Sequence, residues 1–256
     1  MTIYNDKISI IMPAYNAEHY IASSIISVQA QTWNDWELII INDCSTDRTN
    51  EIISTFTASD SRIIVLDNFY NLGAAQSRNK GIKYAQGKWI AFLDSDDCWV
   101  PEKLEHQLAY AYKKHASFIF TASNFMNENG ELLNSYLSVP EQVNYQELLK
   151  QNVISCSSVL IKKELILPYP MELSECMHED FAVWLKILKD NKMIAHGLNQ
   201  PLLIYRISAA SKSGNKVKAA RMTFRVYRYI GLSLPLSIYN WLFYVKRSLH
   251  KYSNLK

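Results

Sequence analysis

Three carboxylates follow an apolar segment near residue 95, and their spacing suggests chemistry more clearly than any other part of this sequence. Residues 89–93 (Trp-Ile-Ala-Phe-Leu) predict a buried strand that ends at Asp94, Asp96 and Asp97. Carboxylates held side by side repel one another and raise each other's pKa. The cluster therefore suits a hard divalent cation and the phosphates that such a cation carries. The alternative is a solvated acidic turn, because Asp is common in turns.

Strand and helix patterns alternate along the first hundred residues, which predicts an α/β fold with a mostly parallel sheet. Strands are expected at 8–12, 36–41, 62–66 and 89–93, and helices at 17–31 (capped by Asn16), from Ser45 or Thr46 to Phe56, and at 73–85. Ligands of such sheets bind at the carboxyl ends of the strands. Residues 13–16, Asp43 and the Asp94 cluster all follow strand ends, so we expect them to meet at one edge.

The sequence lacks the glycine-rich motifs of two large nucleotide-binding classes. It has no GxGxxG after the first strand and no GxxxxGK[ST], which argues against a dinucleotide-dependent dehydrogenase and a P-loop enzyme. A nucleotide diphosphate bound here would need a metal ion to neutralise it.

Length, composition and cysteine usage fit a cytosolic α/β protein. The 256 residues, 48% of them apolar, can form one substantial core, alone or with a tail. The first seven residues are polar, and no signal-peptide core follows them. Cys44, Cys98, Cys156 and Cys176 have no zinc or CxxC spacing, so we expect reduced thiols.

Charge is distributed unevenly along the chain. The last 66 residues contain twelve Lys or Arg and no Asp or Glu, whereas the first 190 carry 15 basic and 24 acidic residues, a net charge of −9. An apolar, aromatic stretch at 229–245 is shorter than the roughly 20 residues of a membrane span and contains Pro235. The tail at 216–256 therefore suits an interfacial helix on anionic lipid. Packing on the rest of the chain or on a homodimer partner is the alternative, and no nucleic-acid-binding motif accompanies the charge.

Five motifs in order resemble the family-2 glycosyltransferases of the GT-A fold, over about residues 8–206. They are IIMPAYN at 10–16, INDCSTD at 41–47, NLGAAQSRNKG at 71–81, FLDSDD at 92–97 and HEDFAVWL at 178–185. Each motif alone is weak, but their common order identifies the family. The resemblance implies a GT-A catalytic domain at 1–215, with a nucleotide-sugar half at about 1–100, an acceptor half at about 101–215 and the helical tail after it.

The resemblance also implies a nucleotide-sugar site. Residues 13–16 (Pro13, Ala14, Tyr15 and Asn16) match the loop that packs on the base, and an aromatic ring there can stack. Asp43 matches a carboxylate that accepts a hydrogen bond from the base, with a helix cap or Asx turn as its alternative. Arg78 matches a basic residue near the base and ribose, with a solvated helix face as its alternative. Many relatives have two Asp where this chain has Asn42 and Asp43.

Asp94-Ser95-Asp96 matches the DxD motif that binds a nucleotide-sugar and its metal. Asp96 would ligate Mg²⁺ or Mn²⁺, and Asp94 would contact the ribose or share in metal binding. Asp97 is interpreted as the cap of a helix that starts near Pro101. Arg206 resembles a residue near the phosphates, with a surface salt bridge as its alternative.

Glu179 and Asp180 match the family's Glu-Asp motif at the start of a helix. Displacement at an anomeric carbon needs a base opposite the leaving group, and Asp180 is our candidate, with Glu179 in support. The alternative is a pair of acids favoured by the helix dipole. One base, one metal and no covalent nucleophile imply inversion.

The sequence thus predicts a metal-dependent inverting hexosyltransferase. Its donor would be a UDP-sugar and its acceptor a lipid-linked bacterial glycan of the O-antigen, capsule, exopolysaccharide or teichuronic type. It would work at the cytoplasmic face of the inner membrane. The alternatives are a sugar nucleotidyltransferase and a catalytically silent nucleotide-binding scaffold.

Overall fold

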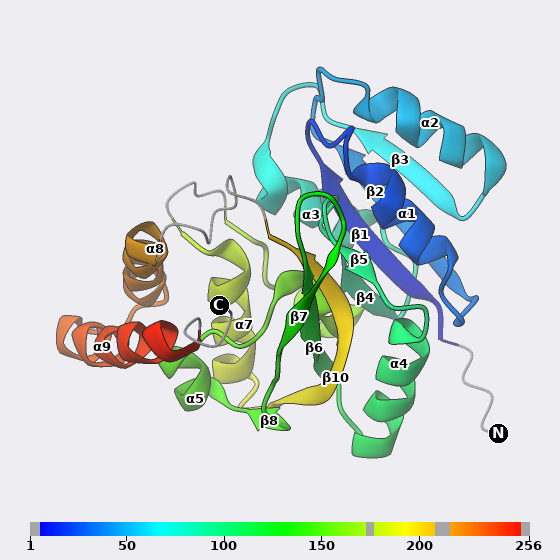
Figure 1. Cartoon of the computed structure of the whole chain (residues 1–256). Helices are drawn as coiled ribbons and strands as arrows, with labels where there is room; N and C mark the ends of the chain where they lie inside the picture. The colour runs from blue at the N-terminus through cyan, green and yellow to red at the C-terminus, as the bar shows by residue number, and fades with distance from the viewer. Residues whose placement is uncertain (1–5, 173–176, 208–215, 252–256) are drawn as a thin grey trace.

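One mixed sheet with helices on both faces forms the body of the protein (Figure 1). The computed structural model describes residues 6–172, 177–207 and 216–251. The ten strands of the sheet lie in the order β3-β2-β1-β4-β9-β6-β10-β5, with β7 paired to β6 and β8 paired to β10.

The first half of the sheet is parallel, as the alternating pattern predicts. Its strands are β1 (Ile8–Ala14), β2 (Trp36–Asn42), β3 (Ile63–Asp67) and β4 (Trp89–Phe92). All three pairings among them are parallel. Their carboxyl ends therefore lie at one edge, where the polar segments after β1, β2 and β4 are brought together.

The second half of the sheet is mixed because β9 (Leu160–Lys162) runs antiparallel between β4 and β6 (Phe118–Met126). Strand β10 (Ala195–Arg206) then pairs in parallel with β6. Short antiparallel strands complete it: β5 (Cys98–Trp99), β7 (Leu132–Leu137) and β8 (Gln142–Val143). A hairpin turn at 127–130 joins β6 to β7, with Gly130 at a φ of 86°.

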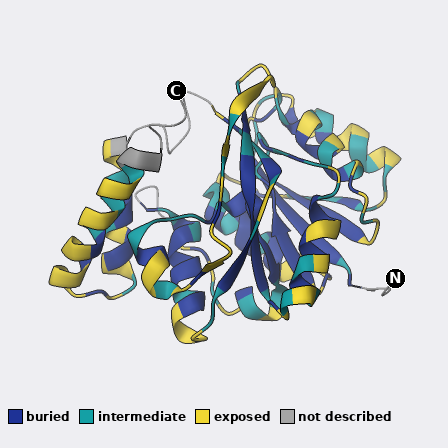
Figure 2. Ribbon diagram, turned by 60° about the horizontal axis from the view of Figure 1, so that its bottom comes forward, coloured by how far each residue is buried: buried dark blue, intermediate teal, exposed yellow. Residues whose placement is uncertain are grey.

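Two apolar layers cover the two faces of the sheet. One contains α1 (Ile21–Gln29), α2 (Thr49–Ser59) and α4 (Lys103–Lys114), with α2 against β3 and α4 against β6, β9 and β10. The other packs α3 (Gly73–Tyr84), α5 (Tyr145–Lys150), α6 (Lys163–Ile166) and α7 (Glu179–Asp190) on the opposite face. The burial pattern in Figure 2 follows this layering, with buried strands in the centre and exposed outer helix faces.

Several expected helix caps are wrong. Asn16 does not cap the first helix, which begins at Ile21; it lies at a φ of 47°, and its side chain accepts a hydrogen bond from the Thr46 backbone. The second helix begins at Thr49 rather than at Ser45 or Thr46. In each case the polar residue makes a contact between loops, which a local capping pattern does not include.

Residues 216–251 form two helices that pack against the rest of the protein. Helices α8 (Lys216–Tyr229) and α9 (Leu234–Lys251) contact each other, α8 contacts α7, and α9 contacts α5. Val226 and Tyr227 belong to the same core cluster as α7. Within the described ranges, no helix has both the length and the apolar character needed to cross a bilayer.

Candidate active site

The loop after β1 forms one side of the site. Pro13 and Ala14 are buried at the end of the strand, whereas the Tyr15 side chain is 50% exposed. The backbone N–H of Asn16 donates to Ser45 Oγ at 3.1 Å, so this loop is fixed to the loop after β2. A fixed backbone with an exposed ring provides a surface on which a planar base can stack.

Asp43 is buried, and its carboxylate organises the start of α3. Its Oδ1 accepts from the backbone of Leu72 and from Asn68, each at 2.8 Å, and its Oδ2 accepts from the backbone of Gly73 at 2.8 Å. Asp43 therefore does act as a helix cap, but for α3, whose first backbone N–H groups it accepts from. Because Oδ2 accepts one hydrogen bond from the described residues and carries two lone pairs, it can still accept a hydrogen bond from a ligand.

The Asp94-Ser95-Asp96 turn follows β4 and is held by two neighbouring elements. The backbone N–H of Asp94 donates to Ser157 Oγ at 3.1 Å, and the backbone carbonyl of Ser95 accepts from Ser24 Oγ at 2.9 Å. Burial, and then the charge of Asp94, raise the pKa of Asp96 to about 6. The sequence analysis did not single out Ser24 or Ser157 as supports of this turn.

Asp97 does not cap a helix, so that interpretation is wrong. It is fully buried, its Oδ1 accepts from the backbone N–H of Arg206 at 3.0 Å, and α4 starts later, at Lys103. Burial, followed by the charges of Asp96 and Asp94, raises the pKa of Asp97 well above its usual value. Asp97 thus joins the turn to β10 and is unsuited to be a charged metal ligand.

Arg78 connects the two acidic motifs, which are more than eighty residues apart in the chain. Its Nη2 donates to Asp94 Oδ1 at 2.6 Å and its Nη1 donates to Glu179 Oε1 at 3.2 Å. Only 5% of Arg78 is exposed, so a solvated helix face is wrong for this residue. Burial opposes its charge, but Cys156, Asp94 and Glu179 around it raise the pKa of Arg78 well above its usual range.

Glu179 and Asp180 open α7, where the helix dipole favours negative charge. Glu179 is buried and paired with Arg78. Asp180 is partly exposed, and its Oδ1 accepts from the backbone N–H of Phe181 at 2.7 Å. Burial, and then the adjacent Glu179, raise the pKa of Asp180, while Arg78 lowers it. A raised pKa makes the Asp180 carboxylate a better proton acceptor than an ordinary aspartate.

Arg206 lies under the same turn. It is buried, so the alternative interpretation, a salt bridge on the surface, is wrong. It is 5% exposed, and its Nε donates to the backbone carbonyl of Asp96 at 2.8 Å. Its Nη1 donates to the carbonyls of Asn127 and Glu128 in the β6–β7 hairpin, and its guanidinium stacks on Tyr20 at 4.5 Å. Arg206 therefore places a positive charge next to the acidic turn and fixes the hairpin beside it.

The donor set fits a divalent cation that is also bound by a ligand. Asp94 and Asp96 are partly exposed carboxylates on one turn, and oxygen ligands of this kind suit Mg²⁺ and Mn²⁺. Among the residues that the structure describes, no group of three His, Cys, Asp or Glu side chains could hold a metal by itself. The remaining ligands would have to come from a diphosphate and water.

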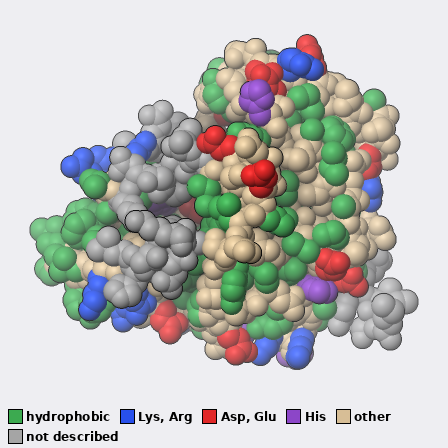
Figure 3. All heavy atoms as spheres, in the orientation of Figure 1, with side chains coloured by type: hydrophobic (Ala, Val, Ile, Leu, Met, Phe, Trp, Pro, Cys, Tyr) green, Lys and Arg blue, Asp and Glu red, His purple; other side chains and the backbone are tan. Residues whose placement is uncertain are grey.

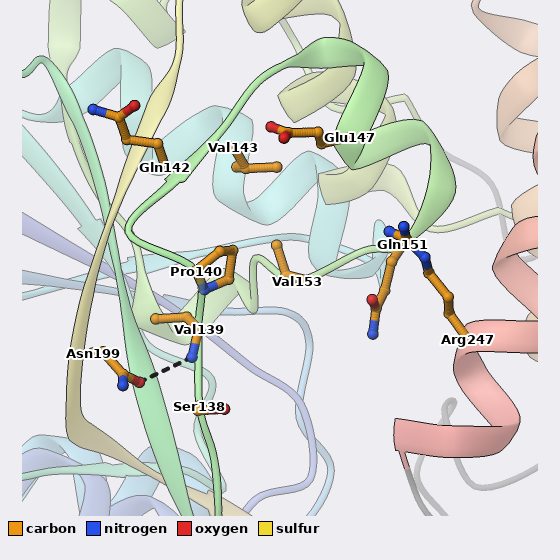
Figure 4. A pocket seen from close by; sticks show the side chains of 10 residues that line it. All are labelled: Ser138, Val139, Pro140, Gln142, Val143, Glu147, Gln151, Val153, Asn199 and Arg247. Atoms are coloured by element: carbon orange, nitrogen blue, oxygen red, sulfur yellow. Dashed lines mark hydrogen bonds between the residues drawn. The ribbon is translucent and has the colours of Figure 1, made fainter.

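A cavity of about 490 Å³ lies apart from these residues, between the segment at 138–143, α5 and α9 (Figure 4). Its lining combines aliphatic side chains with amides, and Glu147 and Arg247 add one charge of each sign. None of the predicted site residues lines it, so it is not the centre that the motifs define. The described cysteines, Cys44, Cys98 and Cys156, are free thiols as expected, and Cys176 lies outside the described residues.

Comparison with known proteins identifies the family. The profile of glycosyl transferase family 2 matches residues 9–163, which is more than half of the chain. The chain belongs to this family. It is 40% identical over 230 residues to the teichuronic acid biosynthesis glycosyltransferase TuaG of Bacillus subtilis, covering 90% of each protein. It is 41% identical over 219 residues to WfgD of Escherichia coli, named as a UDP-Glc:α-D-GlcNAc-diphosphoundecaprenol β-1,3-glucosyltransferase, covering 86% of this chain and 84% of WfgD.

Solved structures place this family-2 member in the GT-A fold. The S. aureus TarS fragment 1–349 with UDP-GlcNAc aligns with a TM-score of 0.73 at 20% identity, covering 96% of this chain and 72% of that one. The mannosyltransferase PcManGT of Pyrobaculum calidifontis, in complex with GDP-Man and Mn²⁺, aligns with a TM-score of 0.62 at 14% identity, covering 99% and 76%. At these identities the likeness shows the fold, and the mixed sheet flanked by helices agrees with it.

Proposed function

We propose that this family-2 glycosyltransferase moves a sugar from a UDP-sugar to a hydroxyl of a lipid-linked bacterial glycan. The reaction would depend on a divalent metal ion and would invert the configuration at the anomeric carbon. The carrying observation is the Arg78 bridge, which holds Asp94 of the DxD turn beside the Glu179-Asp180 pair. A donor diphosphate at Asp94 and Asp96 would therefore place its sugar near Asp180.

The two acids at the start of α7 have different environments, which supports different roles. Glu179 has its carboxylate on Arg78, so its negative charge is compensated and its position is fixed. Asp180 accepts only from its neighbouring backbone in the described contacts, and its raised pKa favours proton uptake. We therefore assign Asp180 as the base and Glu179 as its positioning partner.

The reaction would be a single displacement. The acceptor oxygen attacks the anomeric carbon, the bond from that carbon to the diphosphate oxygen breaks, and the electron pair leaves with UDP. The acceptor proton passes to an oxygen of Asp180. Because the base lies opposite the leaving group, the anomeric configuration inverts.

A Mg²⁺ or Mn²⁺ ion held by Asp94 and Asp96 would supply charge neutralisation for the departing diphosphate. Arg206, beside the carbonyl of Asp96, would add positive charge on the same side. Tyr15 would stack on the base and Asp43 Oδ2 would accept from it, with Pro13, Ala14, Asn16 and Ser95 shaping the pocket.

The relatives support the acceptor class. WfgD is named for a diphosphoundecaprenol-linked acceptor and TuaG for teichuronic acid biosynthesis, so a lipid-linked glycan of a cell-surface polysaccharide is the proposed acceptor class. TarS in complex with UDP-GlcNAc supports a UDP-sugar as donor. We propose the cytoplasmic face of the inner membrane as the place of reaction, because a nucleotide-sugar donor and a lipid-linked acceptor could meet there.

Calorimetry and an activity assay together test this proposal. UDP, GDP and dTDP are titrated with and without Mn²⁺, and UDP-sugars are then tested with a diphosphoundecaprenol-linked GlcNAc acceptor. Asp180→Asn should lower kcat about 10²- to 10⁴-fold without weakening UDP binding. Asp190→Asn, the same change at the exposed far end of α7, is the matched control and should leave kcat unchanged.

The two alternative functions give different results in these assays. A silent scaffold would bind no nucleotide, or would bind it with no transfer to any acceptor. A nucleotidyltransferase would instead form a UDP-sugar from UTP and a sugar phosphate. Full activity of Asp180→Asn would refute the assignment of the base.

A further inference from the structure

Helix α9 exposes apolar side chains along the face that it turns away from the protein. Its inward face combines Ser237 and Asn240, which are buried, with Trp241, whereas its outward face carries leucine, isoleucine and aromatic side chains. Surface helices usually turn their apolar stripe to the core and their polar stripe to water. The exposed apolar face indicates that this side of α9 meets a partner other than water.

The inward polar groups of α9 need no partner from the body of the protein. Ser237 Oγ donates to the carbonyl of Ser233 at 2.9 Å, and Asn240 Nδ2 donates to the carbonyl of Leu236 at 2.8 Å, so both bond to their own backbone. Trp241 Nε1 donates to the carbonyl of Ala220, which fixes α9 on α8. The helix is therefore held in this orientation, and its outward apolar face is a stable feature.

The outward face is continuous along the helix axis. At 100° per residue, Ile238, Tyr239, Leu242 and Phe243 lie within one half of the helix, and all four are exposed. Tyr239 and Phe243 pack against each other, with ring centroids 4.9 Å apart. The apolar patch at the α9 end of the molecule, with basic side chains at its margins, is visible in Figure 3.

The charged side chains that α8 and α9 carry are all basic, while Glu147 of α5 lies beside Arg247 at the cavity. Arg221 and Arg225 on α8, and Lys246 and Arg247 on α9, are exposed, and the last 66 residues contain no acidic residue. Two copies of this face would bring like charges together, which disfavours a self-complementary dimer through it. An apolar strip flanked by Lys and Arg instead suits the headgroup region of an anionic bilayer.

We propose that α9 lies in the plane of an anionic phospholipid surface, with Ile238, Tyr239, Leu242 and Phe243 inserted among the acyl chains and the basic residues of α8 and α9 on the headgroups. The surface is separate from the carboxylate site. The inference shares with the proposed function only the membrane location of the acceptor. It concerns binding, so either proposal can fail without the other.

Vesicle sedimentation of the full chain tests this surface without donor or acceptor. The probes are vesicles of phosphatidylcholine alone and of phosphatidylcholine mixed with phosphatidylglycerol. We expect binding to the mixed vesicles, weaker binding at high salt, and little binding to phosphatidylcholine. Leu242→Asp should lower the partition coefficient about tenfold or more. The change removes a leucine that the bilayer would bury and adds a negative charge that the anionic lipid would repel.

Ile26→Asp is the matched control, because Ile26 on α1 is 55% exposed and Leu242 is 58% exposed. It should bind vesicles like the unchanged protein. Arg221→Glu with Arg225→Glu should abolish the preference for anionic vesicles while circular dichroism shows an intact fold. UDP binding should be unchanged in every variant, which separates this test from that of the transferase site.

Three results would overturn the inference. The first is an absence of vesicle binding by the folded protein. The second is equal loss of binding in Leu242→Asp and Ile26→Asp. The third is a dimer, measured by light scattering without lipid, that Leu242→Asp converts to a monomer, because the outward face would then belong to a second copy of the chain.

Discussion

Replacing Arg78 by Met would remove the positive charge between the two acidic motifs while keeping most of the side-chain volume. Breaking a buried ion pair from one side costs about 3–5 kcal/mol, because the remaining charges lose their partner. The Asp94 side chain is 33% exposed and can be solvated, whereas that of Glu179 is only 10% exposed. We therefore expect the lower end, about 3 kcal/mol, in the free energy of unfolding. For a chain of this size that is a fall in Tm of about 6–12 °C.

The pH dependence of this loss distinguishes lost charge compensation from lost packing. Arg78 lowers the pKa of Asp96 and Asp180, so its removal would raise both values further. A group whose pKa is raised by folding stabilises the protein below its unfolded pKa, and that contribution is lost as pH rises through the folded pKa. The stability of Arg78→Met should therefore continue to fall above about pH 6, where the loss from Asp96 in the unchanged protein levels off.

Urea unfolding at several pH values measures this effect. Arg78→Lys keeps the charge but cannot form the two-ended bridge, so it should lie between the other two proteins in stability and should restore the shallow pH dependence. A loss below about 1 kcal/mol, or an equal loss for Met and Lys at every pH, would refute the reasoning.

Three further changes test other parts of the structure. The pKa of Asp96 is raised to about 6, so a proton should compete with the cation for this carboxylate at acidic pH. Calorimetry should show the affinity for a UDP-sugar with Mn²⁺ falling about tenfold from pH 7.5 to pH 5. An affinity that is constant over this range would contradict Asp96 as a ligand. Tyr15→Ala should weaken UDP binding about tenfold, the expected loss of one stacked ring, while Tyr84→Ala, at another exposed ring, should not. Gly197→Ala should lower the free energy of unfolding by about 1–3 kcal/mol, because the added Cβ would lie 2.0 Å from the carbonyl oxygen of Pro140; unchanged stability in urea would show that this backbone can move apart.

The first half of the sheet was predictable because its signals are local. Apolar runs such as 36–41, separated by helical periods, predict parallel strands, and the polar residues after each run must then share an edge. The acidic residues of the DxD turn were singled out at a strand end in the same way, whereas the Glu-Asp pair came from the resemblance to the family's motif. Their roles in catalysis stay predictions until the variants are measured.

The second half of the sheet was less predictable, because its pairings join distant segments. Strand β9 has only three residues, and its antiparallel insertion between β4 and β6 depends on partners about 40 to 70 residues away. Asp97 and Asn16 were misplaced for a related reason. Both bond to residues on other elements, so a local capping pattern could not identify their partners.

Local periodicity and motifs in a fixed order were enough to identify the family, the α/β class and the acidic residues at strand and helix ends. They could not reveal that Arg78 joins Asp94 to Glu179, that Arg206 lies buried under the DxD turn, or that α9 exposes an apolar face. The partner of a charge and the buried face of a helix depend on which elements pack together. That packing is set by contacts between residues far apart in the chain, which no local pattern contains.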